Sequence, residues 1–344
     1  IQEKMIGGLF EEYRSLNNSE KILEGPNYLY TDVELHASPK HKRIAEDENA
    51  VELLVPRHRS LFDYAILQPI HHDFINMKIV ILAGHNLFVG KFDDTLRYFG
   101  AFMYLRDNTV LKREGLKKVY LSKPRYQREV FPSYIRKQVF TKDDGPRHDF
   151  LVFIEYEKDP ETGKSNAGRT KTGRLRELNW SFLKLLYQLA SETGTKLYIT
   201  PLNISFSKIP DAVYVVHPTK LKGNFKTIRY LTEQHFVFDR YPKYARSHEE
   251  AKLSATIRYG DPELINDYSF ESFLDFRDYG HKLKDKIGEL ETVFPCSFIY
   301  SCMDEKTEIS ITELSERMKQ RYEYYRENNI YTSRLEKNGT MLQA

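Results

Sequence analysis

The sequence predicts a mixed α/β fold: a central sheet flanked by helices, with a helical N-terminal element and a helical C-terminal subdomain. Short apolar runs alternate with helix-compatible segments from residue 51 to about 265, and this alternation is typical of an α/β domain. After residue 265 the strand-like runs largely stop. The 344 residues, of which 40% are hydrophobic, can bury a sizeable core. We therefore expect an N-terminal element and linker at 1–50, an α/β domain at 51–265 and a helical subdomain at 266–344.

Each element is predicted from its own pattern. The first residues have helix-compatible apolar spacing, and a charged, turn-prone stretch follows at 38–50. Strands are expected at VELLV (51–55), MKIVILA (77–83), AFMYL (101–105), DFLVFIEY (149–156) and KLYITPLNISF (196–206). Helices are expected at SLFDYAILQPI (60–70), FDDTLRYFG (92–100) and LRELNWSFLKLLYQLASETG (175–194). Near the C-terminus, Ser310 and Glu313 have capping-box spacing before a helix that Asn328 and Asn329 end.

Composition excludes several classes of protein. The net charge of +3 lacks the excess expected when nucleic acid is the main partner. The only cysteines, Cys296 and Cys302, fit neither a zinc ribbon nor a redox C-x-x-C motif, so we expect a reducing compartment. No apolar run approaches the roughly 18 to 20 residues of a membrane span. The chain begins with Ile1 and is therefore interpreted as processed or trimmed, with any anchor or address in the missing part.

The stretch VPRHRSLFDYAIL (55–67) places charged residues between two apolar runs. If the strand ends near Pro56 and Ser60 caps the next helix, Asp63 falls in the first turn and its side chain can reach back to His58. A carboxylate that orients an imidazole at a helix N-terminus makes a general base for a hydroxyl. Ser60 and Asp63 also form a simple capping pattern, so a purely structural role stays open.

Cations recur after later predicted strands. Arg106 ends YFGAFMYLR, and a polar loop carries Lys158, Lys164, Arg169 and Lys171. Because loops at strand ends of an α/β sheet converge on one crevice, these side chains are candidates to bind one phosphate. The alternative for each is a solvated surface charge. His71, His72 and Asp73 suggest a metal site only weakly, since adjacent histidines diverge on a regular element; we expect no metal.

These motifs together resemble a known family. VPRHRSLFDY resembles the HRSxxDY form of the H-x4-D block of glycerolipid acyltransferases, more narrowly the glycerol-3-phosphate and dihydroxyacetone-phosphate O-acyltransferase branch. AGHNL and GAFMYLR are similar to its AGxNL and GAFFIRR blocks. The segment from FIE to KTG is similar to the third block, ITPLNISFSKIPD to the fourth, and RYGDP to the later FGEP element. The resemblance spans roughly residues 50 to 335.

The resemblance implies a glycerolipid acyltransferase fold and acyl transfer from an acyl thioester, acyl-CoA or acyl-carrier protein, to the sn-1 hydroxyl of glycerol 3-phosphate in phospholipid synthesis. It makes His58 the base and Asp63 its orienting partner. It also implies four acceptor phosphate ligands, Arg106, Lys158, Arg169 and Lys171, and five further motif residues, Arg59, Ser60, Gly100, Glu155 and Pro201. It implies no cofactor beyond the co-substrate. The implied location is peripheral, on the cytoplasmic face of a membrane.

The chain departs from the family pattern in its second and third blocks. Leu105 stands where one of two arginines is usual, and Tyr156 to Pro160 replace a Gly-Gly-Arg-Ser-Arg core. Lysine cannot reproduce the bidentate fork of arginine. The acceptor could therefore be dihydroxyacetone phosphate or lysophosphatidate. A third alternative is a non-catalytic lipid or phosphate binder that keeps the fold.

Overall fold

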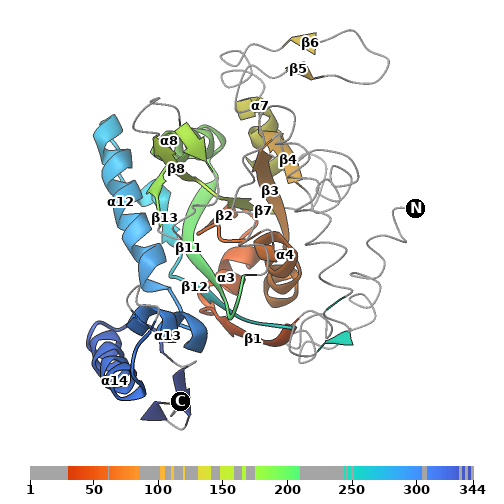
Figure 1. The fold of residues 1–344 in the computed structure, drawn as a ribbon. Coiled ribbons are helices and arrows are strands. Elements are labelled where there is room, and N and C mark those ends of the chain that lie inside the picture. Colours follow the sequence, from red (N-terminus) through yellow and green to blue (C-terminus); the bar gives the residue numbers. More distant parts are fainter. Residues whose placement is uncertain are drawn as a thin grey trace.

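The computed structural model describes residues 30–60, 62–84, 101–104, 110–111, 119–120, 131–140, 148–158, 165–167, 175–209, 244, 247–248, 252–303, 308–332, 335–337 and 340–341. Within these ranges, a main sheet has the strand order β1-β12-β11-β2-β7-β3-β4, with β13 paired to β11. Helices cover both faces of this sheet (Figure 1). The mixed central sheet flanked by helices that the sequence predicts is therefore confirmed.

The elements of the main sheet and its covering helices have the following bounds: β1 Tyr30–His36, α3 Lys40–Glu46, β2 Ala50–Pro56, α4 Phe62–Ile75, β3 Lys78–Gly84, β4 Ala101–Tyr104, α7 Phe131–Ile135, η3 Arg136–Phe140, β7 His148–Val152, α8 Trp180–Thr193, β11 Lys196–Phe206, β12 Leu253–Tyr259, β13 Glu263–Leu264, η6 Ile265–Asp267 and α12 Phe273–Glu289. Smaller elements are β5 Val110–Leu111, β6 Val119–Tyr120, β8 Glu155–Lys158, β9 Ser165–Ala167, β10 Glu177–Leu178, α13 Pro295–Met303, α14 Ile311–Glu327, β14 Glu336–Lys337 and β15 Thr340–Met341.

The strands β11, β2, β7, β3 and β4 are mutually parallel, whereas β12 runs antiparallel to β11. The carboxyl ends of five neighbouring strands thus meet at one edge of the sheet. In open α/β sheets, ligand sites form in the crevice outside those carboxyl ends. The loop after β2 and the segment after β7 both leave the sheet at this edge.

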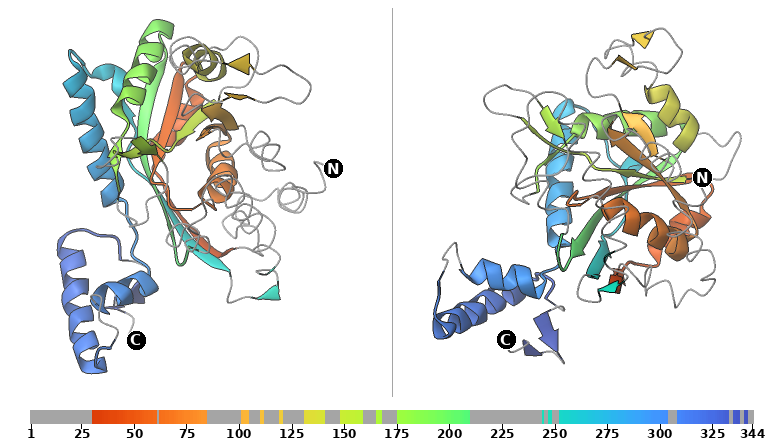
Figure 2. Two further views of the ribbon diagram at one scale, coloured as in Figure 1. Left: turned by 45° about the horizontal axis from the view of Figure 1, so that its top comes forward. Right: turned by 45° about the vertical axis from the view of Figure 1, so that its right-hand side comes forward.

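Two hydrophobic clusters lie on opposite faces of the sheet. Side chains at alternate positions of β2 divide between them: Leu54 packs with Ile66 and Leu67 of α4, while Leu53 packs with Leu183 of α8 and other residues of the second cluster. This alternation follows from the period of two in a strand. Figure 2 shows α12 alongside α8 on one face and α4 on the other.

The C-terminal helices α13 and α14 bury a third cluster of their own, which includes Phe298, Cys302, Met318 and Tyr322. Helix α14 begins as the sequence predicts: the Ser310 side chain accepts a hydrogen bond from the Glu313 backbone N–H at 3.1 Å. It ends at Glu327, directly before Asn328 and Asn329. The predicted domain boundaries near residues 50 and 265 stay a prediction.

Several elements differ from the sequence interpretation. Helix α3 lies within the predicted linker, and α8 begins at Trp180, after β10, where the sequence predicts a helix from residue 175. Residues 30–36 form β1, a strand that pairs in parallel with β12, within a segment for which the sequence predicts only a helical element and a linker. The predicted strand 149–156 is divided into β7 and β8, with Phe153 and Ile154 between them. This division turns the chain where it leaves the sheet and places Glu155 beside the loop that follows β2.

Candidate active site

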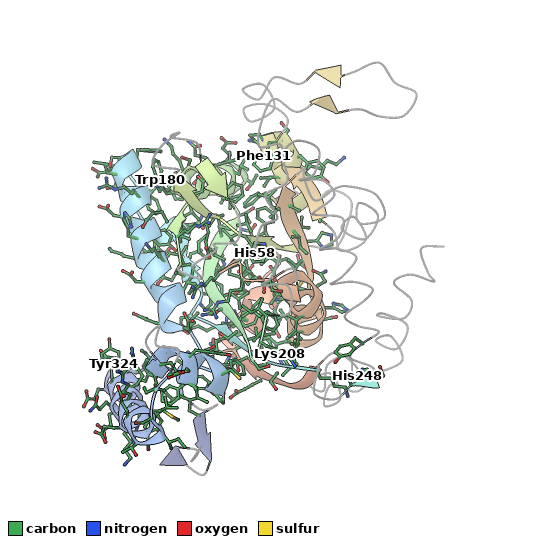
Figure 3. All side chains as sticks on the ribbon, viewed as in Figure 1. His58, Phe131, Trp180, Lys208, His248 and Tyr324 are labelled. Carbon is green, nitrogen blue, oxygen red and sulfur yellow. The ribbon has the colours of Figure 1, made fainter. Side chains whose placement is uncertain are left out.

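His58 lies in the short loop between β2 and α4, at the carboxyl edge of the parallel strands. Strand β2 is buried along its whole length because it is central in the sheet. It ends at Pro56, and α4 begins at Phe62, so Arg57, His58, Arg59 and Ser60 form the turn between them. Figure 3 shows His58 near the middle of the molecule, among side chains from several strands.

The side chain of Asp63 organises this loop. Its Oδ2 atom accepts a hydrogen bond from His58 Nδ1 at 2.9 Å. The same oxygen accepts the backbone N–H groups of Arg59 at 2.9 Å and Ser60 at 3.0 Å. Both donors belong to the loop before α4, so the Asp63 carboxylate connects the loop backbone to the first turn of the helix. The geometry that the spacing predicts, with a first-turn Asp reaching back to His58, is present.

The contact to Asp63 determines which ring nitrogen of His58 carries the proton. A neutral imidazole that donates from Nδ1 has its lone pair on Nε2. The side chain of His58 is 8% exposed, and that of Asp63 is fully buried. The ring of Phe153 lies against the His58 ring, with centroids 4.2 Å apart. The imidazole is therefore fixed in tautomer and orientation, as proton transfer requires.

Glu155 holds the backbone of the same loop. Its Oε1 atom accepts the backbone N–H of His58 at 3.2 Å, across 97 positions of sequence. Burial raises the pKa of Glu155 to about 7, although the hydrogen bond from His58 and the nearby Arg57 and Arg176 oppose this rise. The sequence marks Glu155 only as a motif residue, and the structure shows that it supports the backbone of the candidate base.

Arg57 and Arg59 both bind one carboxylate. Arg57 Nη1 donates to Glu291 Oε2 at 2.7 Å, and Arg59 Nη2 donates to Glu291 Oε1 at 2.5 Å. Burial acts to raise the pKa of Glu291, but Arg59 and Arg57 outweigh it and hold the pKa below its usual value. Burial and the adjacent Arg59 lower the pKa of Arg57. Sequence reasoning missed Glu291, and no local pattern marks it, because it lies 234 positions from Arg57.

Pro201 and the RYGDP segment meet at the same end of the sheet. Pro201 lies in β11 opposite Val55 of β2, and its carbonyl accepts the Gly260 backbone N–H at 2.8 Å. A Cβ atom at position 260 would lie 2.6 Å from Pro201 Cγ. Glycine is therefore required at this close approach, and the two sequence motifs form one structural contact.

The structure brings together only some of the predicted site residues. His58, Asp63, Arg59, Ser60 and Glu155 share the loop after β2 and its supports. Three predicted phosphate ligands, Arg106, Arg169 and Lys171, lie outside the described residues, as does Gly100. Lys158 is the last residue of β8, and its side chain lies outside the description. The phosphate-binding role of these cations stays a prediction.

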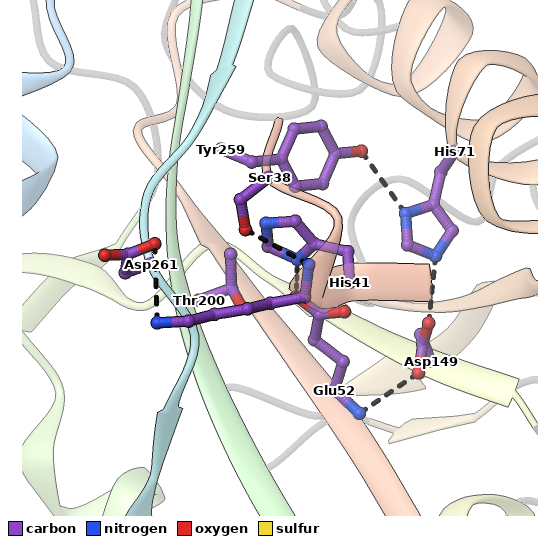
Figure 4. A network of polar contacts seen from close by, with 9 residues as sticks. Ser38, His41, Glu52, His71, Asp149, Thr200, Tyr259 and Asp261 are labelled. Carbon is purple, nitrogen blue, oxygen red and sulfur yellow. Dashed lines mark hydrogen bonds and ion pairs between the residues drawn. The ribbon is translucent and has the colours of Figure 1, made fainter. Parts of the chain in front are cut away.

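A second group of polar side chains is buried on the α4 face of the sheet (Figure 4). His41 Nδ1 lies 2.6 Å from Glu52 Oε1, and the Thr200 hydroxyl also donates to Glu52. His71 bonds Asp149 through Nε2 at 3.0 Å and the Tyr259 hydroxyl through Nδ1 at 3.2 Å. Burial raises the pKa of Tyr259 well above its usual value, which keeps it protonated. His71 is thus part of the core, away from the exposed His72.

Within the ranges that the structure describes, no group of three or more His, Cys, Asp or Glu side chains is arranged to hold a metal ion. In those same ranges, no helix has both the length and the apolar character needed to cross a bilayer.

No family model matches the sequence, and no match is found among curated proteins. Solved structures similar to this chain include the 1-acyl-sn-glycerophosphate (LPA) acyltransferase PlsC from Thermotoga maritima. That chain is 14% identical, and the match covers 84% of this chain and 91% of the other, with a TM-score of 0.39. A superposition at this level carries no argument about activity.

Proposed function

We propose that this chain is an acyltransferase that moves a fatty acyl group from an acyl thioester to the hydroxyl of a phosphorylated glycerol. The observation that carries the proposal is the His58–Asp63 pair at the carboxyl edge of the parallel strands, held by two backbone N–H groups of the loop before α4. A histidine oriented by a carboxylate is the arrangement that activates a hydroxyl nucleophile.

The proposed reaction needs one proton shuttle. His58 Nε2 takes the proton of the acceptor hydroxyl as its oxygen attacks the thioester carbonyl carbon, and Asp63 stabilises the imidazolium that forms. The tetrahedral intermediate then collapses: the C–S bond breaks, the new C–O ester bond remains, and the imidazolium returns its proton to the departing thiolate. Holding both substrates in one crevice supplies much of the rate enhancement.

The acceptor proposed is glycerol 3-phosphate, with transfer to its sn-1 hydroxyl, and the donor is acyl-CoA or acyl-carrier protein. The resemblance of the sequence blocks to glycerol-phosphate acyltransferases supports this choice. Arg106, Lys158, Arg169 and Lys171 would bind the acceptor phosphate through charge-assisted hydrogen bonds. Because the product carries a long acyl chain that must leave into lipid, we also propose peripheral contact with a membrane.

A thiol-release assay with a panel of acceptors tests the proposal. Purified protein should release thiol from acyl-CoA or acyl-carrier protein when glycerol 3-phosphate is present, and much less with glycerol. Arg106→Ala should raise the KM for the acceptor and leave the KM for the donor unchanged, since only the acceptor phosphate is bound there. Faster turnover with lysophosphatidate or dihydroxyacetone phosphate would reassign the acceptor.

The altered third sequence block favours a second candidate, a binder without catalysis. Tyr156 to Pro160 replace the small residues and arginines of the family pattern. Tight binding of glycerol 3-phosphate or lipid with no thiol release from either donor would support that candidate. It would also leave the His58–Asp63 pair without a chemical role.

A further inference from the structure

We propose that Arg57 and Arg59 form a phosphate-binding fork beside His58, and that Glu291 is an internal carboxylate that occupies this fork until a substrate phosphate displaces it. The identity of the substrate rests on the proposed function, whereas the anion site itself rests on the geometry described here. The phosphate could belong to the acceptor or to the nucleotide part of the thioester donor.

The shape of the contact matches a phosphate. Two guanidinium groups each bind a different oxygen of the same carboxylate, at 2.7 and 2.5 Å. A phosphate monoester offers the same paired oxygens with more negative charge, and arginine is well suited to bind such groups. The Nε atoms of Arg57 and Arg59 are buried and have no hydrogen-bond partner among the described residues. The fork therefore keeps donors that an anion larger than a carboxylate could use.

The two arginines are more buried than the carboxylate that they bind. The side chains of Arg57 and Arg59 are 9% and 15% exposed, whereas that of Glu291 is 39% exposed. Two cations are thus held inside the protein, and their counterion reaches them from the solvent side. Removing the carboxylate without replacing it would leave both cations buried and unpaired, which is strongly unfavourable. Exchange for a solute anion avoids that cost.

The surrounding charge also favours an anion. Arg258 Nη1 donates to the backbone carbonyls of Glu289 and Glu291, both at 3.3 Å, which places a third guanidinium group at the Glu291 segment. Two arginines therefore bind the Glu291 carboxylate, and a third binds the backbone of the same segment. Arg57 and Arg59 flank His58 in the loop after β2, so the proposed phosphate site belongs to the same loop as the candidate base.

The backbone at Glu291 is anchored, so only its side chain needs to move. Glu291 lies between α12 and α13. The next residue, Thr292, donates its N–H to the Ser205 hydroxyl at 3.4 Å and pairs with Tyr331 in an isolated bridge. Rotation about the side-chain bonds of Glu291 would carry its carboxylate into solvent without disturbing these contacts. The fork would then open without a change in the fold.

Glu291→Gln tests the proposal in the full chain, with Glu289→Gln as the matched control. Glu289 is an exposed carboxylate two residues earlier, so it gives the same change in net charge. The probes are inorganic phosphate, glycerol 3-phosphate and CoA, each titrated by calorimetry without turnover. If Glu291 fills the fork nine-tenths of the time, its neutralisation should tighten phosphate binding about tenfold, because the apparent Kd scales inversely with the competent fraction. Glu289→Gln should change it less than twofold.

Further measurements identify the ligand and control for misfolding. The tighter phosphate binding should disappear in the double variant Glu291→Gln with Arg59→Gln. Competition of phosphate by glycerol 3-phosphate would assign the fork to the acceptor, and competition by CoA alone would assign it to the donor. If Glu291→Gln does not fold, Glu291→Asp, which retains the charge but reaches less far, should still tighten phosphate binding.

Unchanged or weaker phosphate binding in the folded Glu291 variants would overturn the proposal. Glu291 would then be a permanent structural partner of the two arginines. Because these titrations need no turnover, they can succeed or fail independently of the acyl-transfer assay.

Discussion

In the part of the chain that the structure describes, buried histidine–carboxylate pairs lie in two regions, at the carboxyl edge of the sheet and in the core below it. At the edge, His58 of the loop bonds Asp63 of α4, and the Asp63 carboxylate also accepts the backbone N–H groups of Arg59 and Ser60. In the core, His41 bonds Glu52 and His71 bonds Asp149, and the side chains of both histidines are fully buried. The same two chemical groups therefore occur in surroundings that suit different roles.

The difference lies in what else each pair contacts. Both ring nitrogens of His71 are bound, one to Asp149 and one to Tyr259, so its ring acts as a fixed link between β7 and β12. His58 sits instead at the end of β2, where strand ends converge and a substrate can approach. The position of the pair in the fold, at the edge of the sheet or in the core, therefore distinguishes a candidate base from a structural link.

The largest effect is expected for His58→Ala. Loss of a general base should lower turnover by roughly 10² to 10⁴-fold. Asp63 keeps the backbone N–H groups of Arg59 and Ser60, so the loss of stability should be smaller than in a core variant such as His71→Ala. Asp63→Asn should also be severe, since an amide cannot stabilise an imidazolium. His281→Ala, an exposed histidine on α12, is the control for both. Parallel loss of activity and stability in His58→Ala would remove the distinction between the two regions.

The core pair should show the opposite pattern. His71→Ala leaves Asp149 buried without its partner, so we expect the free energy of unfolding to fall by about 3 to 5 kcal/mol. Turnover per folded molecule should be unchanged. His72→Ala removes the exposed neighbour on the same helix and should leave stability within about 0.5 kcal/mol of the parent. Denaturant titration of the three proteins measures both values, and equal stabilities would contradict a structural role for His71.

The raised pKa of Glu155 should make the stability of the folded protein depend on pH. Its pKa is raised to about 7 from 4.5, so the folded protein keeps this proton where the unfolded chain has lost it. The stabilising contribution is complete below about pH 4.5 and is lost as the pH rises through 7. From the size of this shift, the stability of the parent relative to Glu155→Gln should fall by about 3 kcal/mol between pH 4.5 and 8. Parallel stability curves for the two proteins would show that Glu155 has an ordinary pKa.

The smallest effect is expected for Tyr259→Phe. This change removes the hydroxyl that bonds His71 Nδ1 and retains the ring that lies against His41. One lost hydrogen bond should cost about 1 kcal/mol of unfolding free energy, with no change in turnover. A large loss of activity would mean that the core network extends functionally to the edge of the sheet.

The sequence predicts the part of the site that is local in the chain. His58 and Asp63 are five positions apart, and a strand, a turn and a helix start suffice to bring them together. Strand β11 and the cap of α14 are likewise predicted from their own residues. These features depend on short-range periodicity and capping, which one sequence carries in full.

The missed features depend on distant partners. His41 stands in the charged stretch that the sequence interprets as a linker, yet its side chain is fully buried against Glu52. Strand β1 has little apolar signal alone, and only its pairing with β12 makes it a strand. Glu291 is an ordinary acidic residue after a helix until it meets Arg57 and Arg59. Contacts of this kind leave no trace in local composition.

The contact between Glu291 and Arg57 also has a consequence during synthesis. The two residues are separated by 234 positions. At translation rates of about 5 to 20 residues per second, the ribosome needs roughly 10 to 50 s to add a segment of that length. During this interval the nascent chain carries Arg57 and Arg59 without Glu291 to neutralise them. Strand β1 also has no partner until β12 has been synthesised. The emerging polypeptide is therefore exposed to chaperones and polyanions for many seconds before its sheet can close.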